Sequence, residues 1–273
     1  MLVFPNAKIN IGLHILNKLA DNYHGLQTVM IPVLTCFDSI EITENKSYVF
    51  EQFGQIEGID IQQNIVTKAV TIFRKQFAIP HVKIYLIKQI PNGAGLGGGS
   101  ADAAFTLKGL NTLFGTNANE NQLIAMATEL GSDVPFFINN TPAIASGRGE
   151  ILTSLDFDIK SQKIVLIKPE ASMPTALAYS TITPNNSRIG LNTLLKKPQQ
   201  EWINTISNDF ELTVFDRLPI LKVIKEKMYE AGAVYAAMSG SGTCIYGLFS
   251  NQTTTEQLKS WATNQCYYFH EGH

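Results

Sequence analysis

PNGAGLGGGSADAA, residues 91–104, is the most informative stretch of this chain. Five of its glycines fall within seven positions, at 93, 95, 97, 98 and 99. Glycine permits backbone conformations closed to other residues and lets a ligand approach the main chain closely. Residues 82–90 before it alternate in polarity as a strand does, and residues 100–114 after it have a helical pattern. A strand, a glycine-rich loop and a helix start predict a phosphate-binding loop, because the free N–H groups and positive dipole end of the helix attract an anion.

Two common glycine motifs fit this loop poorly. It matches a Walker-type loop except that Gly99 stands where that motif has its lysine, which contacts the terminal phosphates. It also matches GxGxxG, but the acid that a dinucleotide site needs about 20 residues further on would be Glu120, which begins a helical pattern. A surface loop without a ligand is the remaining alternative. Because ordering several glycines costs backbone entropy, the pattern favours a bound ligand.

The composition is that of a globular protein. The chain has 273 residues, 45% of them hydrophobic and 16% charged, and a net charge of −2. This length predicts two domains, and the absence of a basic excess argues against nucleic-acid or membrane-surface partners. No apolar run is long enough to span a bilayer, and no signal peptide is evident, so we expect a cytoplasmic protein. The three cysteines at 36, 244 and 266 lack metal-site spacing, and reduced thiols are expected.

Strands and helices mix along the whole chain, which predicts an α+β fold with domains at 1–154 and 155–273. Strands are expected at 8–16, 29–34, 38–44, 82–90 and 163–169, at 233–242 and 243–249 around a second small-residue loop, and at 265–270. Helices are expected at 64–77, 100–114, 119–130, 174–182, 218–232 and 253–263, with a hairpin at 141–152. Residues 187–202 are expected to form a connection that contains a helix.

Three motifs occur in one order: PNAKINIGLHI from residue 5, PNGAGLGGGSADAA from residue 91 and MSGSGTCIY from residue 238. This arrangement resembles the GHMP kinases, from residue 4 to about residue 250. The resemblance implies a two-domain α+β fold. Its N-terminal domain would be like domain 2 of ribosomal protein S5, its C-terminal domain would be a ferredoxin-like α/β-plait, and the active site would lie in the cleft between them.

Three further segments point to one branch of this superfamily: AKIN at 7–10, ADNYHGLQT at 20–28 and GSDVPFF at 131–137. They are similar to the members that phosphorylate the 2-hydroxyl of 4-diphosphocytidyl-2-C-methyl-D-erythritol in the non-mevalonate isoprenoid pathway. The resemblance implies ATP, Mg²⁺ and a small-molecule substrate, in a monomer or weak homodimer. Asn22 and Asn92 depart from the usual pattern, but both are loop positions and neither removes a group that the reaction needs.

Two other functions stay open from the sequence. Another GHMP kinase, acting on homoserine, mevalonate or a sugar, would leave the Tyr23–His24 segment unexplained. A nucleotide-binding regulatory module without catalysis would leave the combination of Lys8 and Asp133 unexplained. Both features favour the cytidylyl-alcohol kinase.

The resemblance implies that the loop at 91–101 wraps the triphosphate of ATP, since backbone N–H groups can take the place of a lysine. The residues concerned are Pro91, Asn92, Gly93, Ala94, Gly95, Leu96, Gly97, Gly98, Gly99, Ser100 and Ala101. The Ser100 hydroxyl would be available to a phosphate or to Mg²⁺, with a helix N-cap as the alternative. Asn64 is implied on the adenine side, and it also has the capping alternative.

Asp133 is the expected catalytic base, which accepts the proton of the substrate hydroxyl. Its alternative is to cap a short helix that follows it. Lys8 is the expected catalytic cation, because a lysine in an apolar strand is costly to bury unless it is paired. An Asp133–Lys8 pair would keep the carboxylate ionised and offset charge on the transferred phosphoryl group. The alternative for Lys8 is an edge-strand position with its ammonium in water.

Tyr23 and His24 are expected to bind the cytidine, because an aromatic face stacks on a base and an imidazole can read its edge. The resemblance adds Tyr179 as a second aromatic around the cytosine, although a core or surface aromatic is an equal alternative. It also places Asn10 near the reacting centre and suggests Thr175. His14 is interpreted as structural, and residues 238–246 are expected to pack near the glycine-rich loop.

Overall fold

The structure is a computed structural model that describes residues 1–20, 23–54, 61–159, 161–265 and 267–272. Asn22 and Cys266, which the sequence analysis singled out, lie outside these ranges. The chain divides into two compact units. The first comprises residues 1–7, 36–92 and 97–141, and the second comprises residues 8–35, 93–96 and 142–273. These units interleave along the chain, whereas the split at 154/155 is contiguous and stays a prediction about family domains.

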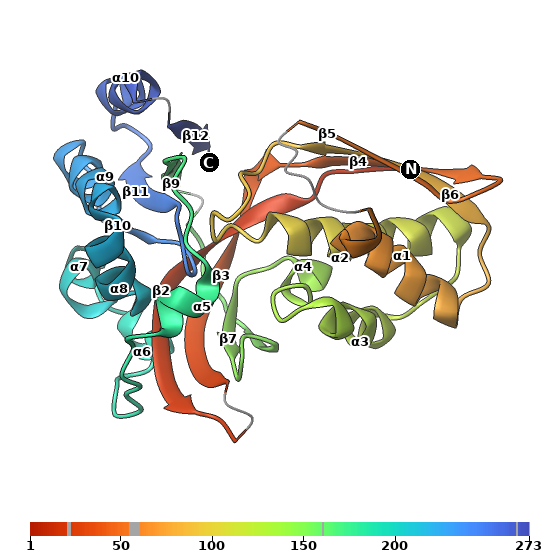
Figure 1. Ribbon diagram of the computed structural model, residues 1–273. Helices are drawn as coiled ribbons and strands as arrows, with labels where there is room; N and C mark the ends of the chain where they lie inside the picture. Colours follow the sequence, from red (N-terminus) through yellow and green to blue (C-terminus); the bar gives the residue numbers. More distant parts are fainter. Residues whose placement is uncertain (21–22, 55–60, 160, 266, 273) are drawn as a thin grey trace. The chain divides into compact units, whose positions relative to one another are not determined.

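A four-stranded sheet forms the first unit together with its helices. The strand order is β1 (Leu2–Val3), β4 (Ser39–Asn45), β6 (His81–Lys88) and β5 (Val49–Gly54). Strand β5 runs parallel to β6, and the other pairs are antiparallel. Every second residue of β6 is buried, and α1 (Ile65–Gln76) and α2 (Gly98–Phe114) lie along one face of the sheet (Figure 1). The alternation thus gives the sheet one apolar face, which the helices cover.

The helix ends of the first unit follow local sequence signals. The α3 helix (Glu120–Leu130) begins with a reciprocal capping box between Asn119 and Gln122 and ends at Gly131, as expected. A short helix, α4 (Phe136–Asn139), follows it, and a 3₁₀ turn, η1 (Ile61–Gln63), precedes α1. Helix α2 begins two residues earlier than expected, because Gly97 caps it in a left-handed conformation with φ +73° and without a side-chain bond.

Two further sheets belong mainly to the second unit. One has the order β2 (Asn6–Lys18), β3 (His24–Phe37), β7 (Ala143–Ser146) and β8 (Ile151–Ser154). The other has the order β10 (Tyr235–Met238), β11 (Ile245–Ser250), β9 (Gln162–Lys168) and β12 (Tyr268–Gly272), with all its pairs antiparallel. All seven residues of β9 are buried, which agrees with the continuous apolar run that predicted this strand.

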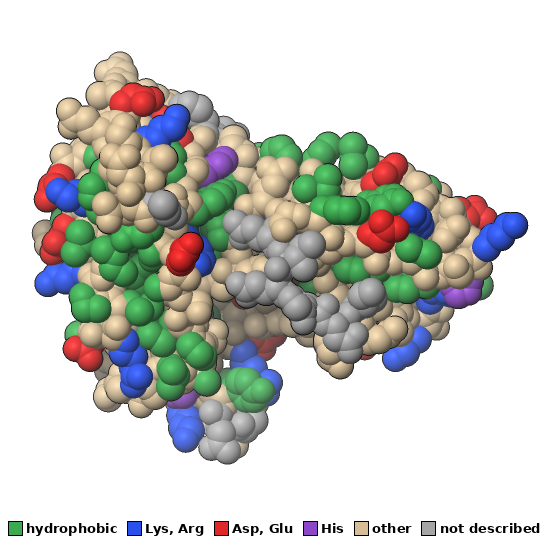
Figure 2. Space-filling model, turned by 45° about the horizontal axis from the view of Figure 1, so that its top comes forward, with side chains coloured by type: hydrophobic (Ala, Val, Ile, Leu, Met, Phe, Trp, Pro, Cys, Tyr) green, Lys and Arg blue, Asp and Glu red, His purple; other side chains and the backbone are tan. Residues whose placement is uncertain are grey.

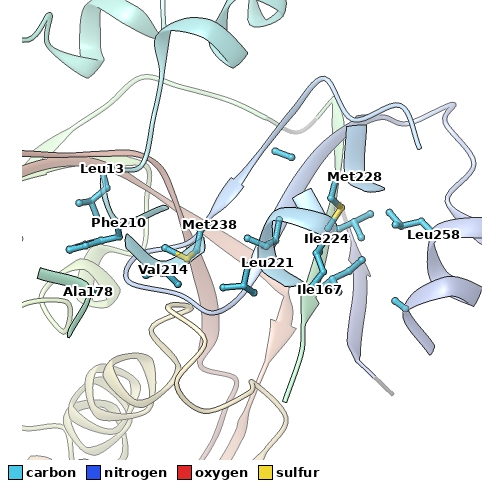
Figure 3. Packing of buried hydrophobic residues seen from close by; sticks show 14 of the residues in the cluster. Leu13, Ile167, Ala178, Phe210, Val214, Leu221, Ile224, Met228, Met238 and Leu258 are labelled. Atoms are coloured by element: carbon cyan, nitrogen blue, oxygen red, sulfur yellow. The ribbon is translucent and has the colours of Figure 1, made fainter. Parts of the chain in front are cut away.

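The second unit also contains six described helices and a 3₁₀ turn, and some of these helices pack against this second sheet. The helices are α5 (Thr175–Tyr179), α6 (Leu191–Leu194), α7 (Trp202–Thr205), α8 (Phe210–Arg217), α9 (Pro219–Glu230) and α10 (Glu256–Asn264), and the 3₁₀ turn is η2 (Gln199–Glu201). In α9, Leu221, Ile224 and Met228 recur at helical spacing and point into one cluster (Figure 3). Burying side chains of this size stabilises the fold by about 1.5–3 kcal/mol each.

Charged side chains of both signs are interspersed on the face of the molecule in Figure 2. This agrees with the small net charge of −2. Among the described residues, no helix combines the length and the apolar character needed to cross a bilayer.

Candidate active site

The first half of the glycine-rich loop packs against residues 238–246, as expected. The carbonyl of Gly93 accepts the N–H of Thr243 at 3.1 Å. Gly95 has φ +73°, and a Cβ added there would lie 1.9 Å from the carbonyl oxygen of Ser239. Only glycine fits this position, because the positive φ disfavours other residues and the Ser239 carbonyl leaves no space for a Cβ.

Lys8 lies beside this part of the loop. It is 2% exposed, and its Nζ donates to Asn10 Oδ1 at 2.5 Å and to the Gly95 carbonyl at 3.0 Å. The alternative that the Lys8 ammonium lies in water is therefore wrong, although β2 is an edge strand of its sheet. Asn10 Nδ2 donates to Thr28 Oγ1 at 3.0 Å, which fixes the amide so that its oxygen faces the lysine. The sequence analysis missed Thr28 as a site residue, although it is a buried polar residue on β3.

Two of the expected substrate residues form a ring stack. The His24 and Tyr179 rings lie with centroids 5.0 Å apart and an interplanar angle of 19°. Tyr179 also meets Phe210 edge to face, with centroids at 4.7 Å. The fold therefore brings the β3 start and the α5 end together into an aromatic surface. Tyr179 is also partly packed against the core, as the alternative for this residue expected, and its role toward a substrate stays a prediction.

Tyr23 is 59% exposed, and the guanidinium of Arg148 lies 4.3 Å over its ring centroid. Cation–π contact of this kind orients an exposed ring. Arg148 was missed, and its only signal was a lone arginine in the turn of the expected hairpin. Thr175 is exposed, and its Oγ1 lies 3.1 Å from Ser241 Oγ.

The second half of the loop forms the start of α2 in the first unit. The N–H of Ala101 donates to the Gly97 carbonyl at 2.8 Å, which is the first intrahelical bond. The preceding N–H groups have no partner within the helix and suit an anion. Ser100 is the third helical residue rather than the cap, so its capping alternative is wrong.

Helix capping was the alternative role for both Asn64 and Asp133, and the structure shows it for Asn64 but not for Asp133 at α4. Asn64 does cap α1, because its side chain accepts the N–H of Val66 at 2.9 Å. Its role toward a nucleotide stays a prediction. Asp133 lies in the turn before α4, whose cap position is Pro135 and carries no side-chain bond. Asp133 belongs to the first unit and Lys8 to the second, and their pairing stays a prediction.

A buried three-charge network lies in the first unit and was not expected. Lys88 donates to Asp102 Oδ2 at 2.7 Å and also to Asp38, and these side chains are at most 5% exposed. Burial raises the pKa of Asp102 well above its ordinary value, although Lys88 opposes this. Burial disfavours the Lys88 ammonium, but the two aspartates raise its pKa overall. The signal in the sequence was the inward position of Lys88 in the alternation of β6.

The stability of the Asp102→Asn variant relative to the wild type is expected to increase as the pH rises from acid to neutral. An aspartate whose pKa is raised by folding favours the folded state at low pH and costs stability above its folded pKa. The asparagine carries no charge and does not incur this cost. The thermal midpoints of both proteins, measured at several pH values between pH 4 and pH 8, would give this difference in stability. A difference between the two proteins that does not change with pH would contradict the raised pKa.

His14 and a nearby cavity complete the polar features of the second unit. His14 is 3% exposed, and its pKa is lowered first by burial and then by Arg188. A neutral buried imidazole agrees with the structural interpretation of this residue. Arg188 pairs with Asp209 at 2.5 Å, and both line a cavity of 790 Å³. None of the expected site residues lines that cavity.

Comparisons with known proteins show which family the chain resembles. The model of the GHMP kinase N-terminal domain matches residues 64–141, and that of the GHMP kinase C-terminal domain matches residues 192–267. Two relatives named 4-diphosphocytidyl-2-C-methyl-D-erythritol kinase come from Parabacteroides distasonis and Bacteroides fragilis. The first is 42% identical over 93% of both chains, and the second is 44% identical over 92% of both.

A crystal structure of 4-(cytidine 5'-diphospho)-2C-methyl-D-erythritol kinase is also similar. It has a TM-score of 0.77 and 28% identity, and the match covers 99% of this chain and 98% of that one. This match and the two domain models confirm the expected α+β kinase fold. The chain belongs to the GHMP kinases and, among them, to the 4-diphosphocytidyl-2-C-methyl-D-erythritol kinase family.

Proposed function

We propose that the chain transfers the γ-phosphoryl group of ATP to the 2-hydroxyl of 4-diphosphocytidyl-2-C-methyl-D-erythritol, which yields the 2-phosphate and ADP. The observation that carries the substrate assignment is the identity of 42–44% over more than nine-tenths of relatives named for this reaction. The ring surface of His24 and Tyr179 supports it, because a cytosine ring can stack on aromatic side chains.

ATP binds through the loop at 91–101 in this proposal. The backbone N–H groups at the start of α2 face the phosphates, and Asn64 lies on the adenine side. A loop without bulky side chains suits the close approach of a triphosphate, and a Cβ at Gly93 would meet nothing within 4 Å. The loop therefore has both the donors and the free space that a nucleotide needs.

Mg²⁺ fits this arrangement as an ion that arrives with the nucleotide. Within the described ranges, no group of three His, Cys, Asp or Glu residues could hold a metal alone. Mg²⁺ usually takes one or two protein oxygens together with phosphate oxygens and water, and the Ser100 hydroxyl would be such a ligand. When bound, the ion neutralises charge on the β- and γ-phosphates.

Asp133 and Lys8 carry the chemistry. The substrate 2-oxygen forms a bond to the γ-phosphorus, and the bond from that phosphorus to the β,γ-bridging oxygen breaks and releases ADP. Asp133 accepts the hydroxyl proton. The Lys8 ammonium, held by Asn10 and the Gly95 carbonyl, offsets charge on the transferred group. Asn10 contacts the substrate near the reacting centre in this proposal, and Thr175 is a further candidate for a substrate contact.

Turnover with defined alcohols tests this function. Purified protein is incubated with ATP and either the cytidylyl alcohol, mevalonate or homoserine, and ADP release is measured. Phosphorus NMR then identifies the product. The proposal expects ADP release with the cytidylyl alcohol only, and a new phosphomonoester on its 2-oxygen. Comparable turnover of homoserine or mevalonate would contradict the substrate assignment, and no ADP with any alcohol would favour a regulatory module.

Tyr179→Ala is expected to raise the KM for the cytidylyl alcohol and to leave the KM for ATP unchanged. Base stacking on an aromatic side chain contributes about 1–3 kcal/mol, or roughly 5- to 150-fold in KM. Tyr179→Phe keeps the ring and serves as the matched control, with a KM near that of the wild type. The same expectation applies to Tyr23→Ala. An unchanged KM in both alanine variants would remove these rings from the substrate site.

The proposal includes a cytoplasmic enzyme that acts on small molecules as a monomer or weak homodimer. Cys36 and Cys244 are buried in the structure, and reduced thiols stay the expectation from the sequence. Light scattering of the purified protein at several concentrations tests the oligomeric state.

A further inference from the structure

Three buried side chains of the first unit join the two ends of the glycine-rich loop. Lys88 is the last residue of β6, and its Nζ donates to Asp102 Oδ2 on α2 at 2.7 Å. The same Nζ donates to Asp38 Oδ2. The strand that enters the loop and the helix that leaves it are thus tied through a single ammonium group.

Asp38 also fixes the direction in which the chain leaves the sheet. Its Oδ1 accepts the N–H of Gln89 at 2.6 Å and the N–H of Ile90 at 2.9 Å. Hydrogen bonds from amides to a carboxylate are among the strong ones in proteins. Asp38 directly precedes β4, which pairs with β6 along its whole length. One carboxylate therefore positions both Lys88 and the two residues that directly precede the loop.

The start of α2 packs directly on this network. A Cβ added at Gly98 would lie 3.2 Å from Lys88 Nζ and 3.0 Å from Ile90 Cγ2. A side chain there would displace either the ammonium or the first helical turn. The network therefore packs against the first turn of α2, whose N–H groups are the proposed phosphate donors.

We propose that Asp38, Lys88 and Asp102 are positioning residues for nucleotide binding, which hold the loop in the conformation where its amides meet the phosphates. The proposal rests on the proposed function, because it requires that this loop binds ATP. Lys88 does not replace the lysine of a Walker-type loop. Its side chain is 5% exposed, and two carboxylates occupy its ammonium.

The double variant Lys88→Met/Asp102→Leu tests this role. It removes one positive and one negative charge, so the net charge stays the same, and apolar replacements of a buried pair usually preserve the fold. The Kd for a non-hydrolysable ATP analogue, measured by calorimetry without the alcohol, is expected to rise at least about 10-fold because the loop loses its preorganisation. The thermal midpoint is expected to stay near that of the wild type.

The matched control is Lys83→Met/Glu51→Leu. It makes the same kind of exchange with a lysine of the same strand, β6, and a glutamate of β5. These partners lie 3.1 Å apart, and their side chains are 30% and 43% exposed. Its Kd for the analogue is expected to stay within about twofold of the wild type, because a surface pair contributes little. A purely structural role for the buried network would lower the thermal midpoint but leave the Kd of the folded protein unchanged.

An unchanged Kd in the buried double variant, or an equal rise in the control, overturns the proposal. If the double variant does not fold, Asp38→Asn decides, because its amide cannot accept both from Lys88 and from the N–H groups of Gln89 and Ile90. An unchanged Kd in that variant also overturns the proposal. Wild-type protein that binds the analogue but does not phosphorylate the cytidylyl alcohol contradicts the proposed function alone. Wild-type protein that does not bind the analogue contradicts both.

Discussion

Asp133→Asn is expected to lower kcat by about 10²- to 10⁴-fold, the usual contribution of a positioned general base. The asparagine has nearly the same size but cannot accept the hydroxyl proton. Binding of ATP is expected to stay nearly intact, because the proposed phosphate contacts come from the backbone of the loop at 91–101. Steady-state kinetics with the cytidylyl alcohol, together with calorimetry of an ATP analogue, would measure the two effects separately.

Asp156→Asn is a suitable control for this variant, because Asp156 is exposed and lies outside the proposed site. It is expected to retain wild-type kcat and KM. A near-normal kcat in Asp133→Asn would refute the base role of this residue. A large loss of ATP affinity in the same variant would instead point to a role in nucleotide binding.

Lys88→Met alone is expected to lower the free energy of unfolding by about 3–5 kcal/mol, the usual cost of breaking a buried ion pair from one side. Removing only the ammonium leaves two buried carboxyl groups facing each other without a cation. The Oδ1 atom of Asp102 makes no hydrogen bond within the described residues, so nothing else compensates its charge. Urea unfolding followed by circular dichroism would measure the change.

The double variant with Asp102→Leu should recover most of this stability, because it removes one of the two uncompensated carboxyl groups. Lys83→Met removes an exposed lysine from the same strand and is expected to change the stability little. Equal destabilisation by the two single lysine variants would show that the buried network does not contribute to folding as described.

The sequence allowed several features of the site to be predicted because they depend on local patterns. The glycine-rich loop, the strand before it and the helix after it are contiguous, and the structure confirms all three. The partners of Lys8 were not predictable, since Asn10 and the Gly95 carbonyl meet it only after the chain has folded. The same holds for Asp38 and Lys88, which are 50 residues apart and meet through the register of β4 on β6.

Parts of the fold that the sequence did not predict have a similar explanation. Strand β5 was missed because only one of its six residues is fully buried, which leaves little apolar alternation. Helix α8 was also missed. It is eight residues long, and helices this short depend on packing, here through Phe210 and Val214, rather than on their own propensity.

A crystal structure with a non-hydrolysable ATP analogue and the cytidylyl alcohol bound would test the central claim most directly. The proposed function predicts that backbone N–H groups within 93–101 contact the phosphates, and that the Asp133 carboxylate lies within hydrogen-bond reach of the 2-hydroxyl. An analogue bound away from the glycine-rich loop, or an Asp133 carboxylate remote from the hydroxyl and the γ-phosphorus, would contradict it.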